Sequence, residues 1–280
     1  MAPLASVVVP AHDEARVLRP NLESLLQGTR PGELDVVVVC NGCADDTADV
    51  ARSVPGVRVV EIATPSKAEA VRVGSRSCSS FPRVHLDADV RLSGPSLRAL
   101  VAALSEPGVH AAAPRRVLDT VGSSWPVRWY YDVWEQLPQV RGGLFGRGVI
   151  ALSQEGQARV DALPAAMSDD LVVSDAFAAH ERRVVSESSV SVVAPRTLPD
   201  LLRRRVRVAT GNAQAAQLGL RRPESATRWP TLGRLLVRRP SLAPRVPVFL
   251  AVAALARVAA HDAVASGDFS TWLRDDSSRA

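Results

Sequence analysis

Short runs of β-branched residues alternate with stretches of helical spacing in the first half of the chain, and this alternation constrains the fold most. The runs lack polar alternation, which is typical of strands buried on both faces of a sheet. They occupy residues 5–10, 34–40, 57–62, 83–86 and 109–113, and the helical stretches occupy residues 14–27, 46–53, 67–77 and 97–104. This order predicts a mainly parallel sheet with helices on its faces.

The second half has a less regular pattern. Trp125, Trp129, Tyr130, Tyr131 and Trp134 stand just before the glycine-rich residues 141–148. These rings either form a binding surface or fill a core, and the sequence leaves both interpretations open.

Further elements are expected towards the C-terminus. They are a short helix from Ser153, a helix opened by Ser168, Asp169 and Asp170, a strand pair near residues 183–185 and 189–193, and helices from Thr197. We predict a catalytic domain over 1–195, divided into halves 1–92 and 93–195, and a basic helical region over 196–280.

Composition excludes several classes of protein. The chain has 280 residues, of which 46% are hydrophobic and 22% charged, which argues against disorder and against a polytopic membrane protein. Three cysteines favour a reducing compartment. The first residues lack the pattern of a signal peptide. We therefore expect a cytoplasmic protein.

Positive charge gathers in one region. Residues 196–239 hold eleven arginines against two acids, which indicates either an anion-facing surface or a solvated helix face. Apart from Trp229, aromatic residues are not interleaved with these arginines, which disfavours binding to nucleic acid. The apolar residues 247–260 are too short to span a membrane. They predict a core or docking helix, with a helix lying on lipid headgroups as the alternative.

Polar clusters follow four of the predicted strands. In a parallel sheet such clusters face one crevice, where ligands bind. They are residues 10–14 (PAHDE), 41–46 (NGCADD), Ser66 with Lys67, and Asp87-Ala88-Asp89. Two carboxylates one residue apart can bind a hard cation such as Mg²⁺ or Mn²⁺, which would neutralise a diphosphate, although a solvated turn explains many isolated Asp-x-Asp sequences.

The motifs together resemble a known family, the inverting family 2 glycosyltransferases of GT-A fold, especially actinobacterial members. They occur in the family's order over about three quarters of the chain. The matching segments are VVVPAHDE (7–14), VVVVCNGCADDTADVA (36–51), KAEAVRVG (67–74), HLDADV (85–90), RGGLFGRGVIAL (141–152), SDDLVVSDAF (168–177) and RRRVR (203–207).

The resemblance implies a nucleotide site in the first half, made of Pro10, Ala11, His12, Glu14, Asn41, Lys67, Asp87 and Ala88. Asn41 replaces the acidic residue that usually binds the base. Asp87 and Asp89 match the metal motif, which implies Mn²⁺ or Mg²⁺. The donor would be a UDP-sugar, with GDP- and TDP-sugars as alternatives.

The resemblance also implies the catalytic residues. Asp170 matches the general base and Asp169 its neighbour, while N-capping of the helix is the competing interpretation. Gly142, Gly143 and Trp134 would line the acceptor site, and Arg203, Arg204 and Arg207 would bind the diphosphate. The Gln and Trp typical of processive members are absent beside these arginines, which favours transfer of a single sugar.

The expected protein is therefore an α/β enzyme with a GT-A, Rossmann-like α/β/α sandwich and a helical C-terminal annex. It would glycosylate a carbohydrate, lipid-linked or small-molecule acceptor, in the cytoplasm or at the inner face of the membrane. A sugar-1-phosphate nucleotidyltransferase is the enzymatic alternative, although PAHDE differs from the glycine-rich loop of those enzymes. A basic scaffold that binds acidic polymer or lipid is the non-enzymatic alternative.

Overall fold

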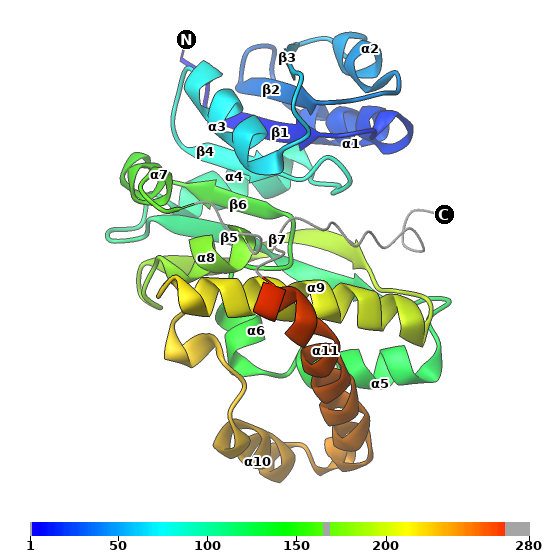
Figure 1. Ribbon diagram of the computed structural model, residues 1–280. Coiled ribbons are helices and arrows are strands. Elements are labelled where there is room, and N and C mark those ends of the chain that lie inside the picture. Colours follow the sequence, from blue (N-terminus) through cyan, green and yellow to red (C-terminus); the bar gives the residue numbers. More distant parts are fainter. Residues whose placement is uncertain (1, 165–168, 267–280) are drawn as a thin grey trace. The chain divides into compact units, whose positions relative to one another are not determined.

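The computed structural model describes residues 2–164 and 169–266. Within these residues the strands form one seven-stranded sheet in the order β3-β2-β1-β4-β6-β5-β7. Figure 1 shows the elements with these labels. β1 pairs in parallel with β2 and β4, and β2 with β3, whereas β6 pairs antiparallel with β4 and β5. The predicted mixed α/β fold with a mainly parallel sheet is confirmed.

The alternation predicted for the first half is confirmed within three residues at each end, except that the last strand, predicted over 109–113, ends six residues later. The elements are β1 (Ala5–Ala11), α1 (Ala15–Leu26), β2 (Leu34–Asn41), α2 (Thr47–Arg52), β3 (Val57–Ile62), α3 (Lys67–Ser77), β4 (Arg83–Leu86), α4 (Gly94–Ala103) and β5 (Ala111–Asp119). All eight residues of β2 are buried, as expected of a strand covered on both faces. In Figure 1, α3 lies on the near side of β1 and β2, which it contacts.

The second half contains more helices than strands. Its elements are α5 (Trp125–Trp134), α6 (Pro138–Gly142), β6 (Val149–Leu152), α7 (Gln154–Asp161), α8 (Asp169–Asp175), β7 (Arg182–Val193), α9 (Leu198–Gln217), η1 (Pro223–Ser225), α10 (Trp229–Arg238), η2 (Pro240–Arg245) and α11 (Val246–Ser266). Ser153 and Thr197 cap α7 and α9 by accepting a backbone N–H, which explains where these predicted helices begin. The helical C-terminal region is confirmed.

The predicted strand pair near 183–185 and 189–193 is wrong. One twelve-residue strand, β7, runs through both segments. Residues 182–193 contain neither Gly nor Pro to form a turn, and exposure alternates from Ser188 to Ser191 as in a continuous strand.

The contacts divide the chain into two compact units. Unit 1 comprises Met1–Val117, Gly146–Pro164 and Ala176–Ser191, and unit 2 comprises Leu118–Phe145, Ala165–Asp175 and Val192–Ala280. The division at residues 195 and 196 into a catalytic and a basic domain stays a prediction.

Unit 2 has its own hydrophobic core, which we call the α5–α11 core. Tyr130 and Tyr131 of α5, Leu201 of α9, Leu235 of α10 and Phe249 of α11 are buried in it. The Tyr130 and Phe249 rings stack with their centroids 5.2 Å apart. These two tyrosines therefore fill a core, which was one of the two interpretations of the aromatic segment.

Candidate functional site

The ends of β1 and β2 are joined by side-chain hydrogen bonds between predicted nucleotide-site residues. His12 Nδ1 lies 2.6 Å from the Asn41 carbonyl oxygen, and Asn41 Nδ2 donates to the Ala11 carbonyl oxygen at 2.7 Å. Asn41 is buried. The Asn41 side chain thus holds the two strand ends together.

The start of α1 is tied to the start of α2. The Glu14 N–H donates to Thr47 Oγ1 at 2.8 Å, while Asp45 accepts from the Thr47 N–H at 3.0 Å and from the Ala15 N–H at 3.2 Å. Partial desolvation raises the pKa of the Asp45 carboxyl, but the hydrogen bonds from Thr47 and Ala15 outweigh it and hold this pKa below its usual value. Asp45 therefore stays ionised while it fixes the position of Glu14.

Lys67, which follows β3, and Asp87, which follows β4, lie side by side. Ser66 caps α3 by accepting the Glu69 N–H, which places Lys67 as the first residue of the helix. Lys67 Nζ lies 2.9 Å from Asp87 Oδ1, directly after β4. The expectation that the ends of parallel strands gather these side chains is met for this pair.

The turn that carries Asp87, Ala88 and Asp89 is held by two residues that sequence reasoning missed. Asn21 Nδ2, on α1, donates to the Ala88 carbonyl oxygen at 2.8 Å. The Asp87 N–H donates to the carbonyl oxygen of Gly148 at 2.8 Å. Gly148 has a φ of +66°, and a Cβ there would lie 2.4 Å from Val90 Cγ2 and 3.1 Å from Asp87 Oδ2. Only glycine lets this backbone approach the carboxylate. Gly148 lies within the recognised RGGLFGRGVIAL segment, but no pattern singled it out, and none marked Asn21.

Two groups of unit 1 residues have the chemistry to hold a cation. The carboxylates of Asp87 and Asp89 are hard oxygen ligands of the kind that Mn²⁺ and Mg²⁺ take, and the Lys67 ammonium already places a positive charge beside Asp87. Among the described residues, His12, Asp13 and Cys43 form a second group whose ligand atoms lie within 4.8 Å of one another. Nitrogen and sulfur ligands suit softer metals. The Asp87 and Asp89 pair therefore fits the expected metal better.

The predicted general base lies in the first turn of α8, in unit 2. Asp169 Oδ1 accepts the Asp170 N–H at 2.9 Å, and Asp170 Oδ1 accepts the Leu171 N–H at 2.8 Å. Both carboxylates therefore accept backbone N–H groups at the start of the helix. Ser168, expected to open this helix, lies outside the described residues.

The segment predicted to line the acceptor site is hydrogen-bonded to α8. The Leu144 N–H, directly after Gly143, donates to Ser174 Oγ at 3.0 Å. Asp175, the last residue of α8, accepts the Arg222 N–H at 3.0 Å. Ser174 and Asp175 thus fix the helix that carries Asp170, and the sequence analysis gave neither a role.

The predicted diphosphate arginines differ in their surroundings on α9. Arg203 is exposed and pairs with Asp200 in the first turn of the helix. Arg205 lies over the Tyr130 ring, with its Cζ 5.6 Å from the centroid. Arg204 and Arg207 are half-buried and lie three residues apart, on one face of the helix.

Trp134, predicted at the acceptor site, packs against the α5–α11 core. Its ring meets that of Tyr131 edge to face, with the centroids 5.5 Å apart. Its role at an acceptor stays a prediction.

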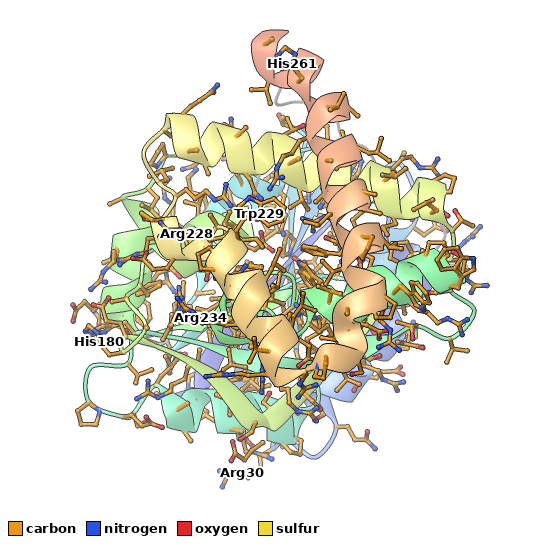
Figure 2. All side chains as sticks on the ribbon, turned by 90° about the horizontal axis from the view of Figure 1, so that it is seen from below. Arg30, His180, Arg228, Trp229, Arg234 and His261 are labelled. Carbon is orange, nitrogen blue, oxygen red and sulfur yellow. The ribbon has the colours of Figure 1, made fainter. Side chains whose placement is uncertain are left out.

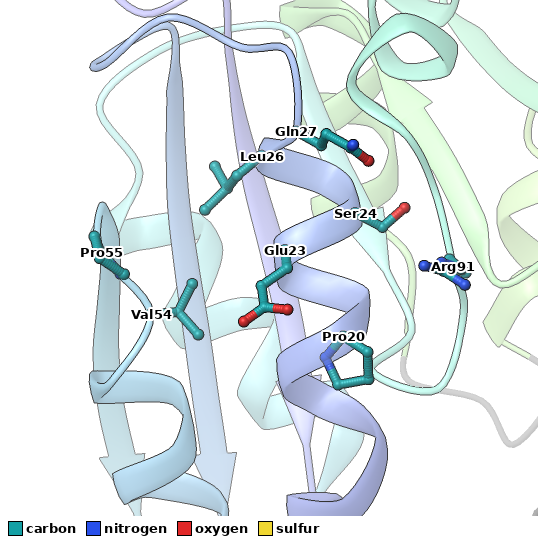
Figure 3. Close-up of a pocket in the computed structure, with 8 residues that line it drawn as sticks. All are labelled: Pro20, Glu23, Ser24, Leu26, Gln27, Val54, Pro55 and Arg91. Carbon is teal, nitrogen blue, oxygen red and sulfur yellow. The ribbon is translucent and has the colours of Figure 1, made fainter.

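An open groove lies elsewhere in unit 1 (Figure 3). It is lined by Pro20, Glu23, Ser24, Leu26, Gln27, Val54, Pro55 and Arg91. None of the predicted site residues lines it, so this groove does not define the site.

Comparison with known proteins gives a family and a fold. Residues 6–150 match the model of Glycosyl transferase family 2. No match was found among curated proteins.

Solved structures share the fold. One is the mannosyltransferase PcManGT from Pyrobaculum calidifontis in complex with GDP-Man and Mn²⁺, at 20% identity and a TM-score of 0.64, covering 96% of this chain and 77% of that one. Another is glucosyl-3-phosphoglycerate synthase from Mycobacterium tuberculosis with Mn²⁺, UDP-Glc and phosphoglyceric acid, at 21% identity and a TM-score of 0.56, covering 78% and 81%.

Proposed function

The chain belongs to glycosyl transferase family 2, and from this premise we propose that it moves one sugar from a nucleoside-diphosphate sugar to an acceptor hydroxyl, with inversion at the anomeric carbon. Its family and fold make it a glycosyltransferase. The nucleotidyltransferase alternative has no observation in its favour, and a basic surface that binds lipid is compatible with a glycosyltransferase.

The ion pair between Lys67 and Asp87 carries the proposal. It brings a cationic side chain to the Asp-Ala-Asp turn at converging strand ends, which is the arrangement that a diphosphate with its metal requires. Pro10, Ala11, His12, Glu14, Asn41 and Ala88 would surround the nucleotide. Both solved neighbours described above hold a nucleotide sugar and Mn²⁺, which supports a metal-dependent donor site of this kind.

Asp87 and Asp89 would hold Mn²⁺ or Mg²⁺, which neutralises the diphosphate when bound. Lys67 would share this task from the other side of Asp87. UDP is the favoured nucleotide, and GDP and TDP are the alternatives that the test below separates.

Asp170 would act as the general base. Its carboxylate would take the proton of the acceptor hydroxyl as that oxygen attacks the anomeric carbon, and the bond from this carbon to the diphosphate oxygen would break with its electron pair leaving on the nucleotide. Asp169 would keep the neighbouring backbone oriented. The hydrogen bond from the Leu171 N–H to Asp170 Oδ1 supports a fixed carboxylate.

The other predicted contacts complete the proposal. Arg203, Arg204 and Arg207 are the candidates for the diphosphate, because a guanidinium group can donate two parallel hydrogen bonds to phosphate oxygens. Gly142, Gly143 and Trp134 would line the acceptor site. The acceptor is a carbohydrate, a lipid-linked sugar or a small molecule, in the cytoplasm or at the inner face of the membrane.

The proposal is tested by thermal shift and calorimetry with UDP, GDP, TDP and their sugar conjugates, with and without Mn²⁺ or Mg²⁺. A ligand that binds only the folded state adds about 2.7 kcal/mol of stability at a hundred times its Kd. We expect one nucleotide to stabilise the wild type only with metal, and Asp89→Ala to abolish this gain. Asp49→Ala, at an exposed aspartate on α2, is the matched control. If no nucleotide binds with any metal while the protein is folded, the proposal is wrong.

A further inference from the structure

Helix α11 is apolar on two opposite faces. Phe249, Val252, Ala256 and Ala260 are buried and recur every three or four residues, so they form the face turned towards the rest of unit 2. On the other side, Leu255 is 55% and Val258 74% exposed. An α-helix that is apolar all round is normally buried all round or in contact with lipid.

The exposed apolar stretch begins before α11. The apolar stretch is longer than the residues 247–260 that the sequence suggested. Residues Pro240–His261 are long and apolar enough to cross a membrane, judged by length and composition over the described residues, and 28% of their most apolar 18-residue window is buried. The stacking of Phe249 on Tyr130 anchors the inner face of α11 in the α5–α11 core. The inner face of the helix is therefore packed within unit 2, and among residues 2–164 and 169–266 nothing covers the exposed side chains of its outer face.

Helix α10 repeats this arrangement. Leu232 and Leu235 are buried in the α5–α11 core, whereas Trp229 is 73% and Val237 85% exposed. Trp229 and Val237 lie eight residues apart, which places them on one side of the helix. The short helix η2 contacts both α10 and α11. Figure 2, which looks at the structure from below, shows α10 and α11 with Arg228, Trp229 and Arg234 labelled. We call the exposed sides of these two helices the α10–α11 surface.

Residues 225–260, between Glu224 and Asp262, carry charge of one sign. Residues 225–260 hold six arginines and no acidic residue. Arg245 pairs with Asp132 at 3.0 Å. The other five are exposed: Arg228, Arg234, Arg238, Arg239 and Arg257.

We propose that the α10–α11 surface binds an anionic lipid bilayer. Exposed Trp, Val and Leu side chains would enter the boundary between headgroups and acyl chains, where the amphipathic indole ring is favoured. The arginines would lie at the lipid phosphates, and the absence of acids in the segment favours a uniformly negative partner over a protein surface of mixed charge. The helices would lie in the plane of the membrane, because the inner face of α11 is held in the core. This inference names a surface and a partner, and it does not rest on the proposed transferase activity.

The test is co-sedimentation of the full chain with vesicles of phosphatidylcholine alone or mixed with phosphatidylglycerol. We expect binding to the mixed vesicles, weaker binding to the neutral ones, and a fall with added salt because exposed charges are screened. One arginine near an anionic surface contributes a factor of about five in partitioning, so Arg234→Glu should weaken binding about 25-fold. Arg30→Glu, at an exposed arginine in unit 1, should leave binding unchanged.

The apolar contribution has a matched control in the same chain. Val237 and Val121 are both 85% exposed, and only Val237 lies on the α10–α11 surface. Val237→Glu should reduce vesicle binding while Val121→Glu should not, and melting temperatures check that each variant folds.

Three outcomes would overturn the inference. The first is that folded wild type does not bind mixed vesicles. The second is that Val237→Glu and Arg234→Glu each bind vesicles as strongly as the wild type. The third is that the wild type self-associates without binding vesicles and Val237→Glu abolishes this self-association, which would make the surface an interface between two copies. Asp89→Ala should bind vesicles as the wild type does. Failure of the nucleotide assay and failure of the vesicle assay are therefore separate results.

Discussion

Lys67 Nζ lies 2.9 Å from Asp87 Oδ1, so the first residue of α3 and the residue after β4 form an ion pair although twenty residues separate them. Both side chains are half-buried, which leaves the pair accessible to a ligand. The lysine lowers the cost of placing two carboxylates, Asp87 and Asp89, in one turn. The Lys67 ammonium group can also donate a hydrogen bond to a phosphate oxygen when a nucleotide binds.

We expect Lys67→Met to weaken binding of the nucleotide with its metal. A hydrogen bond to a charged group contributes about 1.5–3 kcal/mol, so the Kd should rise about tenfold or more. Isothermal titration of the nucleotide identified in the thermal screen measures this. Arg72→Met is the control, because Arg72 lies on the same helix and pairs with Glu69. Equal affinities for wild type and Lys67→Met would show that Lys67 does not reach the diphosphate.

Asp170→Asn should reduce kcat and leave donor binding intact. Loss of a general base costs about 10²–10⁴ in rate. Asp169→Ala separates base from cap, because losing a cap to alanine costs only about 1 kcal/mol of folding stability and leaves the chemistry in place. Steady-state kinetics with urea unfolding on both variants gives the comparison. If Asp170→Asn keeps its kcat, Asp170 is not the general base, and a cap remains possible because asparagine still accepts the Leu171 N–H.

The first half of this fold could be predicted because its signals are local. Apolar runs predict β1 to β4, and Ser66 at the start of α3 fixes where Lys67 stands. Asn21 could not be found in this way, since it reaches the Ala88 carbonyl from 67 positions away. Ser174 bonds the Leu144 N–H across 30 positions. Such contacts depend on how the elements pack, which the local sequence does not record.

Gly142 and Gly143 should respond oppositely to alanine. A Cβ at Gly143 would lie 2.3 Å from Phe145 Cε1 and 2.5 Å from the Gln139 carbonyl oxygen, whereas a Cβ at Gly142 would meet nothing within 4 Å. Overpacking costs about 1–3 kcal/mol, so Gly143→Ala should destabilise by this amount. Gly142→Ala should be neutral or add about 0.4–1 kcal/mol, because alanine restricts the unfolded chain. Urea unfolding of both variants measures the difference, and equal stabilities would contradict the packing described for this segment.

Folding stability should fall below about pH 4, and Asp35 should contribute to that fall. Burial raises the pKa of its carboxyl, but hydrogen bonds from Ser79, Arg58 and Ser6 outweigh burial and hold this pKa below the ordinary 3.8. Ser79 N and Arg58 Nη2 lie 2.9 and 2.6 Å from its oxygens. Because the folded pKa is the lower one, the stabilisation is complete above the unfolded value and is lost as the pH falls through the folded value.

The variant Asp35→Asn tests this contribution. It should cost about 2 kcal/mol at neutral pH, because it removes the charge that Arg58 and Ser79 donate to. It should also flatten the stability profile between pH 5 and the acid limit, since the titrating group is gone. Urea unfolding across this range measures both effects, with Asp49→Asn as the control at an exposed surface pair with Arg52. An unchanged slope in Asp35→Asn would assign the acid sensitivity to other carboxylates, of which Glu33, with its pKa lowered to about 2 by the hydrogen bond from Arg98, is the first to examine.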